Sequence, residues 1–110
     1  MDEIDTARKS RDTMWSNDVA VRDLGMTVEV DAPGVSVAQI EVRDNMVNGH
    51  DICHGGYIFT LADTAFAYAC NSYNRVTVAA SAAVEFVRPG RLGDTLVATA
   101  EEAHRGGRTG

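Results

Sequence analysis

The sequence predicts an α+β fold in which an antiparallel sheet curls around one long central helix. Residues 55–72 form a helix-length stretch with no clear polar face, and a helix that is apolar nearly all round is normally buried. Residues 35–42 alternate in polarity as a strand does, and residues 76–87 form a longer run of β-favouring residues. We therefore expect a single domain over residues 1–110, with the sheet covering the helix.

The other elements follow from periodicity and turn residues. In chain order we expect a helix at 5–24, strands at 26–31 and 35–42, a polar connection at 44–51, the helix at 55–72, and strands at 76–87 and 94–104. Gly25 suits the end of the first helix, and Ala32-Pro33-Gly34 predicts a turn between the first two strands. The apolar positions expected to face inward on the first helix are Ile4, Ala7, Met14, Trp15 and Val19.

The chain ends in a glycine-rich turn, Arg105-Gly106-Gly107-Arg108-Thr109-Gly110, directly after a predicted strand. Such a turn normally leads into a strand that pairs back. A strand without its partner exposes a row of unpaired backbone groups. We therefore expect a C-terminally truncated domain that lacks at least one final strand.

Composition argues against several classes of protein. The 110 residues are 45% hydrophobic, which suits one folded domain and not a disordered segment. The net charge of −6 argues against a nucleic-acid-binding surface. No apolar run reaches membrane-spanning length, and residues 1–10 are too acidic and polar for a targeting peptide. Two cysteines make no disulfide framework, so we expect a cytoplasmic protein without nucleic-acid or membrane partners.

One acidic residue stands out within the central helix. Asp63 is the only residue between His54 and Arg75 that bears a charge at neutral pH. Desolvating an isolated carboxylate is costly unless a neighbouring group uses it. Asp63 is therefore the leading candidate for a catalytic residue. The alternative is a structural acid capped by neighbouring N–H groups.

Several motifs occur together around this residue at fixed spacing. They are His54-Gly55-Gly56, Leu61-Ala62-Asp63-Thr64-Ala65-Phe66-Ala67-Tyr68-Ala69-Cys70-Asn71, Phe86-Val87-Arg88-Pro89-Gly90 and Gly93-Asp94-Thr95-Leu96. A His-Gly-Gly step alone is a weak signal, but the combination is specific. With these motifs the chain, from about residue 15 onward, resembles the hotdog-fold acyl-CoA thioesterases of the phenylacetic-acid-degradation type.

The resemblance implies hydrolysis of the thioester between coenzyme A and a small, often aromatic, acyl group. Coenzyme A is then part of the substrate, and no separate cofactor is expected. Hydrolysis needs a donor for the developing oxyanion and a carboxylate that attacks the carbonyl or activates water. Gly55 begins the helix, so its N–H is an orphan donor at the positive end of the helix dipole. Asp63 matches the position of the family's nucleophile or general base.

The spacing of these two residues predicts a site shared by two chains. Gly55 and Asp63 are eight residues apart in the sequence. Along a helix this separation is about 12 Å. A carbonyl oxygen about 3 Å from the Gly55 N–H cannot place its carbon near Asp63 of the same helix. The acid must come from a second copy, which agrees with the dimer-interface sites of the family, and we expect a homodimer that pairs further into a homotetramer.

Family position adds supporting residues, each with an ordinary structural alternative. His54 would orient the glycine turn or bind the thioester region, or would only hydrogen-bond its loop. Asn48 would support the acid or its water, or would only form an Asn-Gly turn. The expected substrate contacts are Asn17, Tyr57, Phe59, Thr64 and Ser81. The structural alternatives are a surface position for Asn17, core packing for Tyr57 and Phe59, a hydrogen bond to the helix backbone for Thr64 and an ordinary strand position for Ser81.

Basic residues gather in the last quarter of the chain. We expect contacts to the phosphates of coenzyme A from Arg88, Arg91, Arg105 and Arg108. The alternative is a solvated basic surface.

Rival sites and functions can be weighed against this hypothesis. A metal cluster of His50, Asp51, Cys53 and His54 is the first rival, but their spacing matches no standard zinc pattern, so no metal site is expected. A Cys53–His54 nucleophilic pair is set aside because sequence neighbours seldom face each other. A second alternative is a hotdog dehydratase acting on hydroxyacyl thioesters. Dehydration would favour a catalytic histidine placed against an acid, whereas here the acid stands with a glycine N–H, which suits attack on a carbonyl. The main alternative to an active thioesterase is a non-catalytic acyl-CoA-binding protein or an inactive truncated homologue.

Overall fold

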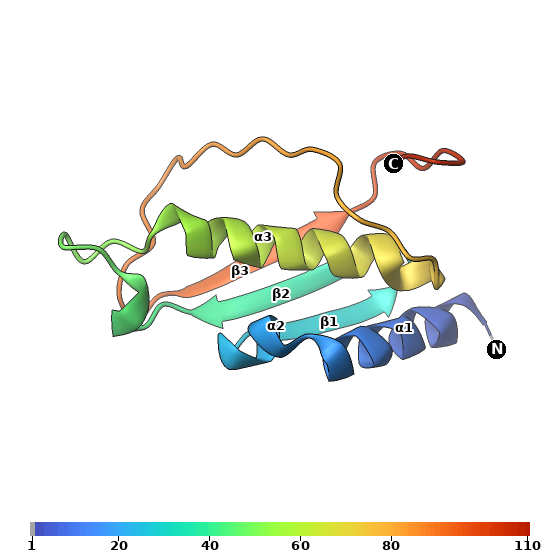
Figure 1. The fold of residues 1–110 in the computed structure, drawn as a ribbon, viewed down its shortest axis with the longest axis horizontal. Coiled ribbons are helices and arrows are strands. Elements are labelled where there is room, and N and C mark those ends of the chain that lie inside the picture. Colours follow the sequence, from blue (N-terminus) through green and yellow to red (C-terminus); the bar gives the residue numbers. More distant parts are fainter. Residues whose placement is uncertain (1) are drawn as a thin grey trace.

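The computed structural model describes residues 2–110 and places a layer of helices against one sheet (Figure 1). In chain order the elements are helix α1 (Glu3–Asn17), helix α2 (Val19–Asp23), strand β1 (Thr27–Ala32), strand β2 (Val35–Glu41), the 3-10 turn η1 (Asp44–Met46), helix α3 (Gly55–Cys70), the 3-10 turn η2 (Asn71–Tyr73) and strand β3 (Thr95–Glu101). The predicted α+β class and the long central helix are confirmed.

The sheet has three antiparallel strands in the order β1-β2-β3. The predicted turn joins β1 to β2, and Gly34 in it has a φ of +75°, which favours glycine. β2 pairs along its whole length with β3, from Val35 opposite Glu101 to Glu41 opposite Thr95. Within residues 2–110 the outer edge of β3 has no partner strand.

One face of the sheet carries the core. Its buried residues alternate along β1 and β2 and are Val28, Val30, Ser36, Ala38 and Ile40. α3 packs on β2 and β3, whereas α1 packs on β1 and η2. Leu61, Ala65 and Tyr68 of α3 complete the core, and the Ser36 hydroxyl donates a hydrogen bond to the Ala65 carbonyl. The central helix is therefore tied to the sheet by both packing and a polar contact.

The N-terminal helix is interrupted at Asp18, so the prediction of one continuous helix over 5–24 was wrong. Asp18 has a φ of −93° and a ψ of 78°, and its carboxylate accepts a hydrogen bond from the Val21 N–H at 3.4 Å. Aspartate is favoured at such an N-cap because it satisfies an unpaired N–H, and a second helix begins there. Val21 is consequently buried, while the expected inward residues Val19 and Ile4 are exposed.

The predicted strand at 76–87 was also wrong. These residues are extended without forming a strand, and Val76 is 99% exposed. Their β-favouring composition requires a neighbouring strand, and the three paired strands offer none at this position. Residues 76–89, here called the crossing segment, instead run alongside α3 from its C-terminal to its N-terminal end (Figure 1). Asn71 anchors the start of this segment through two hydrogen bonds with the backbone of Thr77.

Tyr68 joins the central helix to the break between α1 and α2. The residue is 1% exposed, and its hydroxyl donates a hydrogen bond to the Asp18 carboxylate at 3.2 Å. Burial raises the pKa of Tyr68, and the negative charge of Asp18 raises it further. The folded chain therefore keeps this phenol protonated to a higher pH than a tyrosine in water.

We expect Tyr68→Phe to lower the free energy of unfolding by about 1 kcal/mol, because it removes one hydrogen bond and keeps the ring. In the unfolded chain Tyr68 ionises near pH 10, whereas the folded chain keeps the proton. This contribution to stability is present below about pH 10 and is lost as the pH rises above it. Urea unfolding between about pH 8 and about pH 11 should show a smaller alkaline loss for Tyr68→Phe than for the unchanged chain. An equal loss in the two proteins would contradict this role of Tyr68.

Candidate active site

α3 begins at a backbone that is held from two sides. His54 is the N-cap, with a φ of −57° and a ψ of 136°. Its N–H donates to the Met46 carbonyl at 2.9 Å, and the Cys53 N–H donates to the Gly90 carbonyl at 2.8 Å. These bonds fix the residues before Gly55 to η1 and to the loop that leads into β3.

The N–H of Gly55 is left unused by the protein. Among the described residues it donates to no acceptor, because it lies in the first turn of α3, where no carbonyl of the helix can receive it. Aligned peptide dipoles also give this end of the helix a partial positive charge. Gly55 is only partly buried. Such a donor stabilises an oxygen on which negative charge develops.

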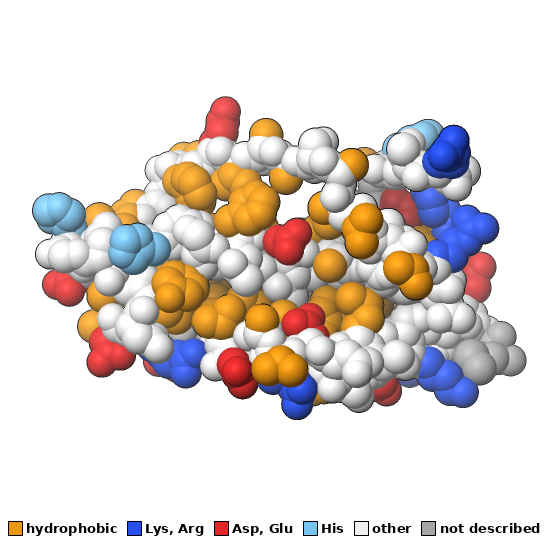
Figure 2. Space-filling model, viewed as in Figure 1, with side chains coloured by type: hydrophobic (Ala, Val, Ile, Leu, Met, Phe, Trp, Pro, Cys, Tyr) orange, Lys and Arg blue, Asp and Glu red, His pale blue; other side chains and the backbone are white. Residues whose placement is uncertain are grey.

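Asp63 lies on an exposed stripe of α3 that is otherwise largely apolar. The exposed residues of α3 recur at helical spacing and are Gly56, Phe59, Ala62, Asp63 and Phe66. Figure 2 shows hydrophobic side chains gathered over α3 and the crossing segment. The expectation that α3 is buried nearly all round, with Asp63 as a buried acid, was therefore wrong for the single chain. The three-stranded sheet covers only one face of this helix.

The carboxylate of Asp63 has no hydrogen-bond or ion-pair partner among residues 2–110. The ion pairs within residues 2–110 join Arg8 to Asp31 and Arg11 to Asp12, and none involves Asp63. The nearby hydroxyls of Thr60 and Thr64 instead donate to carbonyls of the helix itself. The structure thus offers no capping contact that would assign Asp63 a structural role.

Gly55 and Asp63 lie too far apart to act on one carbonyl within a chain. α3 is continuous from Gly55 to Cys70, so it separates them by eight residues. This places them about 12 Å apart along the axis and about 80° apart around it. One chain therefore displays both groups but does not bring them together.

The polar residues that precede α3 have defined positions. Asn48 forms the turn expected as its structural alternative, because its Oδ1 accepts hydrogen bonds from the N–H groups of His50 at 2.9 Å and Ile52 at 3.2 Å. The side chain of His54 is exposed, next in sequence to Gly55. His54 therefore stands beside the free N–H, whereas Asn48 shapes the loop that carries it.

The expected substrate contacts on α3 fall on different faces. Phe59 is on the exposed stripe, and Tyr57 is partly buried against the core. Thr64 is buried, and its Oγ1 donates to the Thr60 carbonyl at 2.7 Å. The hydroxyl of Thr64 is thus used within the helix, and Phe59 is the best placed of the three to meet a ligand beside Asp63.

The two remaining expected contacts lie away from the start of α3. Asn17 is exposed at the end of α1, and its Nδ2 donates to the Thr13 carbonyl at 3.1 Å. Ser81 is exposed on the crossing segment. The structure does not bring either residue together with Gly55 in one chain.

The four candidate phosphate-binding residues are Arg88, Arg91, Arg105 and Arg108. Two of them lie at opposite ends of α3. Arg91 forms a backbone bridge with Ile52, just before the start of α3. Arg105 stacks on the ring of Tyr73, 3.9 Å from its centre, just after the end of α3. These two positions are separated by the 16 residues of α3.

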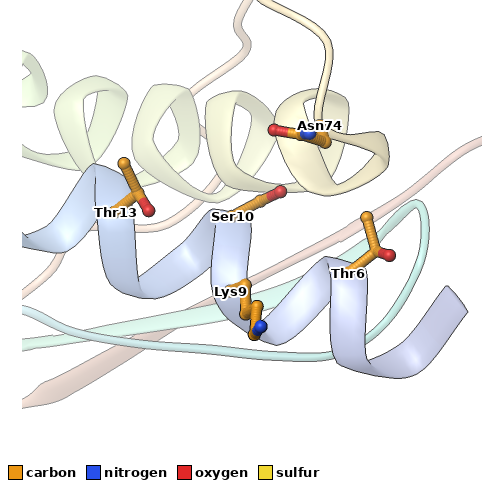
Figure 3. A pocket seen from close by; sticks show the side chains of 5 residues that line it. All are labelled: Thr6, Lys9, Ser10, Thr13 and Asn74. Atoms are coloured by element: carbon orange, nitrogen blue, oxygen red, sulfur yellow. The ribbon is translucent and has the colours of Figure 1, made fainter. Parts of the chain in front are cut away.

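Two surface hollows lie along α1. One is lined by Thr13, Met14, Asn17 and Asp18. The other is lined by Thr6, Lys9, Ser10, Thr13 and Asn74, and Figure 3 shows it between α1 and the turn that follows α3. Neither hollow is lined by Gly55 or Asp63.

The structure also bears on a metal site, on a Cys53–His54 pair and on a membrane-spanning helix. Within the described part of the chain, no group of three or more His, Cys, Asp or Glu side chains is placed to hold a metal ion. Burial raises the pKa of the Cys53 thiol, which contacts the carbonyl of His54 and not its imidazole. Over residues 2–110, no helix is long and apolar enough to cross a membrane.

Sequence reasoning missed Phe86 as a neighbour of the site. Its ring lies against Gly55, within 3.0 Å of the position that a Cβ on this glycine would take. Phe86 opens the Phe-Val-Arg-Pro-Gly motif, which was the available signal. Only the folded chain shows that this motif packs on the His-Gly-Gly turn.

Comparison with known proteins places this site in a family. The family model described as "Thioesterase superfamily" matches residues 50–110. The acyl-coenzyme A thioesterase PaaI of Escherichia coli is 47% identical over 97 residues, which cover 88% of this chain and 69% of that protein. A putative esterase of Archaeoglobus fulgidus is 33% identical over 110 residues, covering 94% of this chain and 71% of the relative.

Solved structures agree in fold. The PaaI protein from the phenylacetic acid degradation operon of Escherichia coli superposes with a TM-score of 0.93 at 42% identity, covering 96% of this chain and 77% of that one. A Streptococcus mutans protein solved with bound acetyl CoA has a TM-score of 0.70 at 29% identity, covering 74% of this chain and 66% of that one. The chain therefore belongs to the thioesterase superfamily and has the hotdog fold of the PaaI-type acyl-CoA thioesterases.

Proposed function

We propose that this protein hydrolyses the thioester of small acyl-coenzyme A compounds, with arylacetyl groups as the preferred class. One observation carries the proposal. Over residues 2–110, the Gly55 N–H at the positive end of α3 has no acceptor, and the Asp63 carboxylate on the exposed stripe forms no ion pair. Acyl-CoA thioester hydrolysis needs both groups. The 47% identity to an acyl-coenzyme A thioesterase supports the same reaction.

The proposed chemistry assigns one role to each group. The Gly55 N–H donates to the thioester carbonyl oxygen and stabilises the charge that develops there, with help from the helix dipole. Asp63 either attacks the carbonyl carbon or accepts a proton from the attacking water. In either route the carbon–sulfur bond breaks, and coenzyme A leaves as the thiol after its sulfur takes a proton from water or from Asp63. Where Asp63 attacks directly, water then hydrolyses the anhydride formed between Asp63 and the acyl group, so both routes release the free acid. Coenzyme A enters as part of the substrate, so the step uses no separate cofactor.

A two-fold dimer would bring the two groups together. In a symmetric contact, Gly55 of each copy faces Asp63 of the other. The two α3 helices then run antiparallel, with residue 59 midway between the two contacts. The midpoint of each Gly55–Asp63 segment lies near residue 59. In this arrangement the midpoints of the two copies are no farther apart than Gly55 of one copy is from Asp63 of the other. Phe59 occupies this position, and its 37% exposed side chain suits burial at the two-fold axis.

The same dimer would bring arginines of the two chains to the same side of the site. Arg91 lies at the Gly55 end of its own chain. Because the helices run antiparallel, the far end of the partner's α3, with Arg105 beside it, lies toward the same side. We propose that arginines from the two chains contact the phosphates of coenzyme A, where bidentate contacts favour arginine.

A thiol-release assay over a panel of acyl-CoA thioesters tests the proposal. We expect one free thiol for each acid formed, with phenylacetyl-CoA cleaved faster than acetyl-CoA or long saturated acyl-CoA. Binding of acyl-CoA without any release of thiol would contradict the proposal and indicate a carrier or regulator. Dehydration of a 3-hydroxyacyl-CoA without thiol release would contradict it in favour of a dehydratase.

A further inference from the structure

Phe86 has an unusual position for an aromatic residue of the crossing segment. It is 56% exposed, yet the edge of its ring rests on the backbone of Gly55. Its Cζ, Cε1 and Cε2 atoms lie 3.0, 3.2 and 3.4 Å from where a Cβ on Gly55 would stand. The neighbouring Val87 is 85% exposed. The ring is thus held against the start of α3 while much of its surface stays open.

This position lies beside the donor that the proposed function uses. A Cβ atom stands about 2.5 Å from the nitrogen of its own residue. The nearest ring atom, 3.0 Å from that Cβ position, is therefore within about 5.5 Å of the Gly55 nitrogen. An oxygen bound to this N–H lies about 3 Å from the nitrogen. That oxygen is therefore no more than about 8.5 Å from the nearest atom of the Phe86 ring, within reach of an acyl group attached to its carbon.

We infer that Phe86 is a specificity-determining residue that forms one wall of the acyl site. The inference rests on the proposed function and adds to it the residue that selects the acyl group. In an arylacetyl thioester, one methylene separates the aromatic ring from the carbonyl. Two aromatic rings attract each other in offset or edge-to-face geometry at centroid distances of about 4.5–7 Å. Phe86 is placed to make such a pair with a substrate ring and to favour it over a saturated one.

The test compares phenylacetyl-CoA with cyclohexylacetyl-CoA, two thioesters of similar size of which only one has an aromatic acyl group. In Phe86→Leu, which keeps an apolar side chain, we expect the ratio of their kcat/KM values to fall about two- to tenfold. Phe86→Tyr keeps the ring and should retain the ratio. Val87→Ala, at the exposed neighbouring position, should also leave it unchanged. The ratio within one variant does not depend on how much of the protein is folded.

Each outcome decides the assignment. A lower ratio in Phe86→Leu alone supports it. An unchanged ratio in Phe86→Leu overturns it, as does an equal fall in Val87→Ala, which would indicate general loosening of the crossing segment. If the unchanged chain cleaves neither thioester, the proposed function itself fails, and the assignment of Phe86 fails with it.

Discussion

Replacing Asp63 by asparagine is expected to lower kcat for phenylacetyl-CoA by about 10²–10⁴-fold, the range lost with a general base. Asparagine has nearly the same size, but its amide can neither attack a carbonyl nor accept a proton from water. Asp63 is exposed and forms no ion pair, so the free energy of unfolding should change by less than about 0.5 kcal/mol. Thiol release measures the turnover, calorimetry with coenzyme A measures binding, and binding should persist.

A matched control separates this effect from the loss of one negative charge. Asp23→Asn makes the same change at an exposed position on α2, a different helix, and should retain full turnover. Full turnover by Asp63→Ala would show that the carboxylate has no part in the reaction.

Replacing Gly55 by proline is expected to lower kcat by about 10²–10³-fold, the range found when one oxyanion donor is removed. Proline lacks the N–H but is favoured at the first position of a helix. The preceding His54 already has a ψ of 136°, which is compatible with a following proline. The substitution therefore removes the donor while the helix remains, which circular dichroism can verify.

Gly55→Ala is the necessary companion of this variant. Alanine and proline both place a Cβ 3.0 Å from the present position of the Phe86 ring, but only alanine keeps the N–H. Comparison of kcat between the two variants therefore tests the N–H with the Cβ contact to Phe86 held the same. Within the described part of one chain, no atom lies within 4 Å of a Cβ added at Gly56, so Gly56→Ala tests an added methyl group at the start of the helix without the Phe86 contact. Equal activity of Gly55→Pro and Gly55→Ala would show that this N–H is not used.

The local features of this fold were predictable because they depend on nearby residues. The apolar run of α3, the glycine pair at its start and the turn at Gly34 all follow from short-range rules. The break at Asp18 was missed because an aspartate can either continue a helix or cap a new one, and here its partners Val21 and Tyr68 decide. The prediction of secondary structure was wrong where a distant contact selects between two conformations that are both acceptable locally.

Features that depend on distant parts of the chain were not predictable in the same way. A β-favouring composition at 76–87 does not ensure a strand, because a strand needs a neighbour that the sequence pattern does not supply. Similarly, an apolar helix predicts burial but not what buries it. The stripe that holds Phe59 and Asp63 is left exposed by the described residues of one chain. The contact of Phe86 with Gly55 joins residues 31 positions apart and emerges only on folding.

The central claim is that each active site takes its N–H from Gly55 of one copy and its carboxylate from Asp63 of another. Mixing Asp63→Asn chains with Gly55→Pro chains, followed by joint refolding, tests it directly. Each variant alone should be almost inactive. In a mixed dimer one of the two sites combines an intact Gly55 with an intact Asp63, and the other carries both changes.

Random pairing makes about half of the dimers mixed, and half of their sites are intact, so about one quarter of the wild-type activity should return. Differently tagged chains and copurification establish that mixed dimers have formed. Recovery of activity to about one quarter is the result predicted by a site shared between two copies. No recovery in a sample that contains mixed dimers would contradict the account, because it would mean that both groups must come from the same chain.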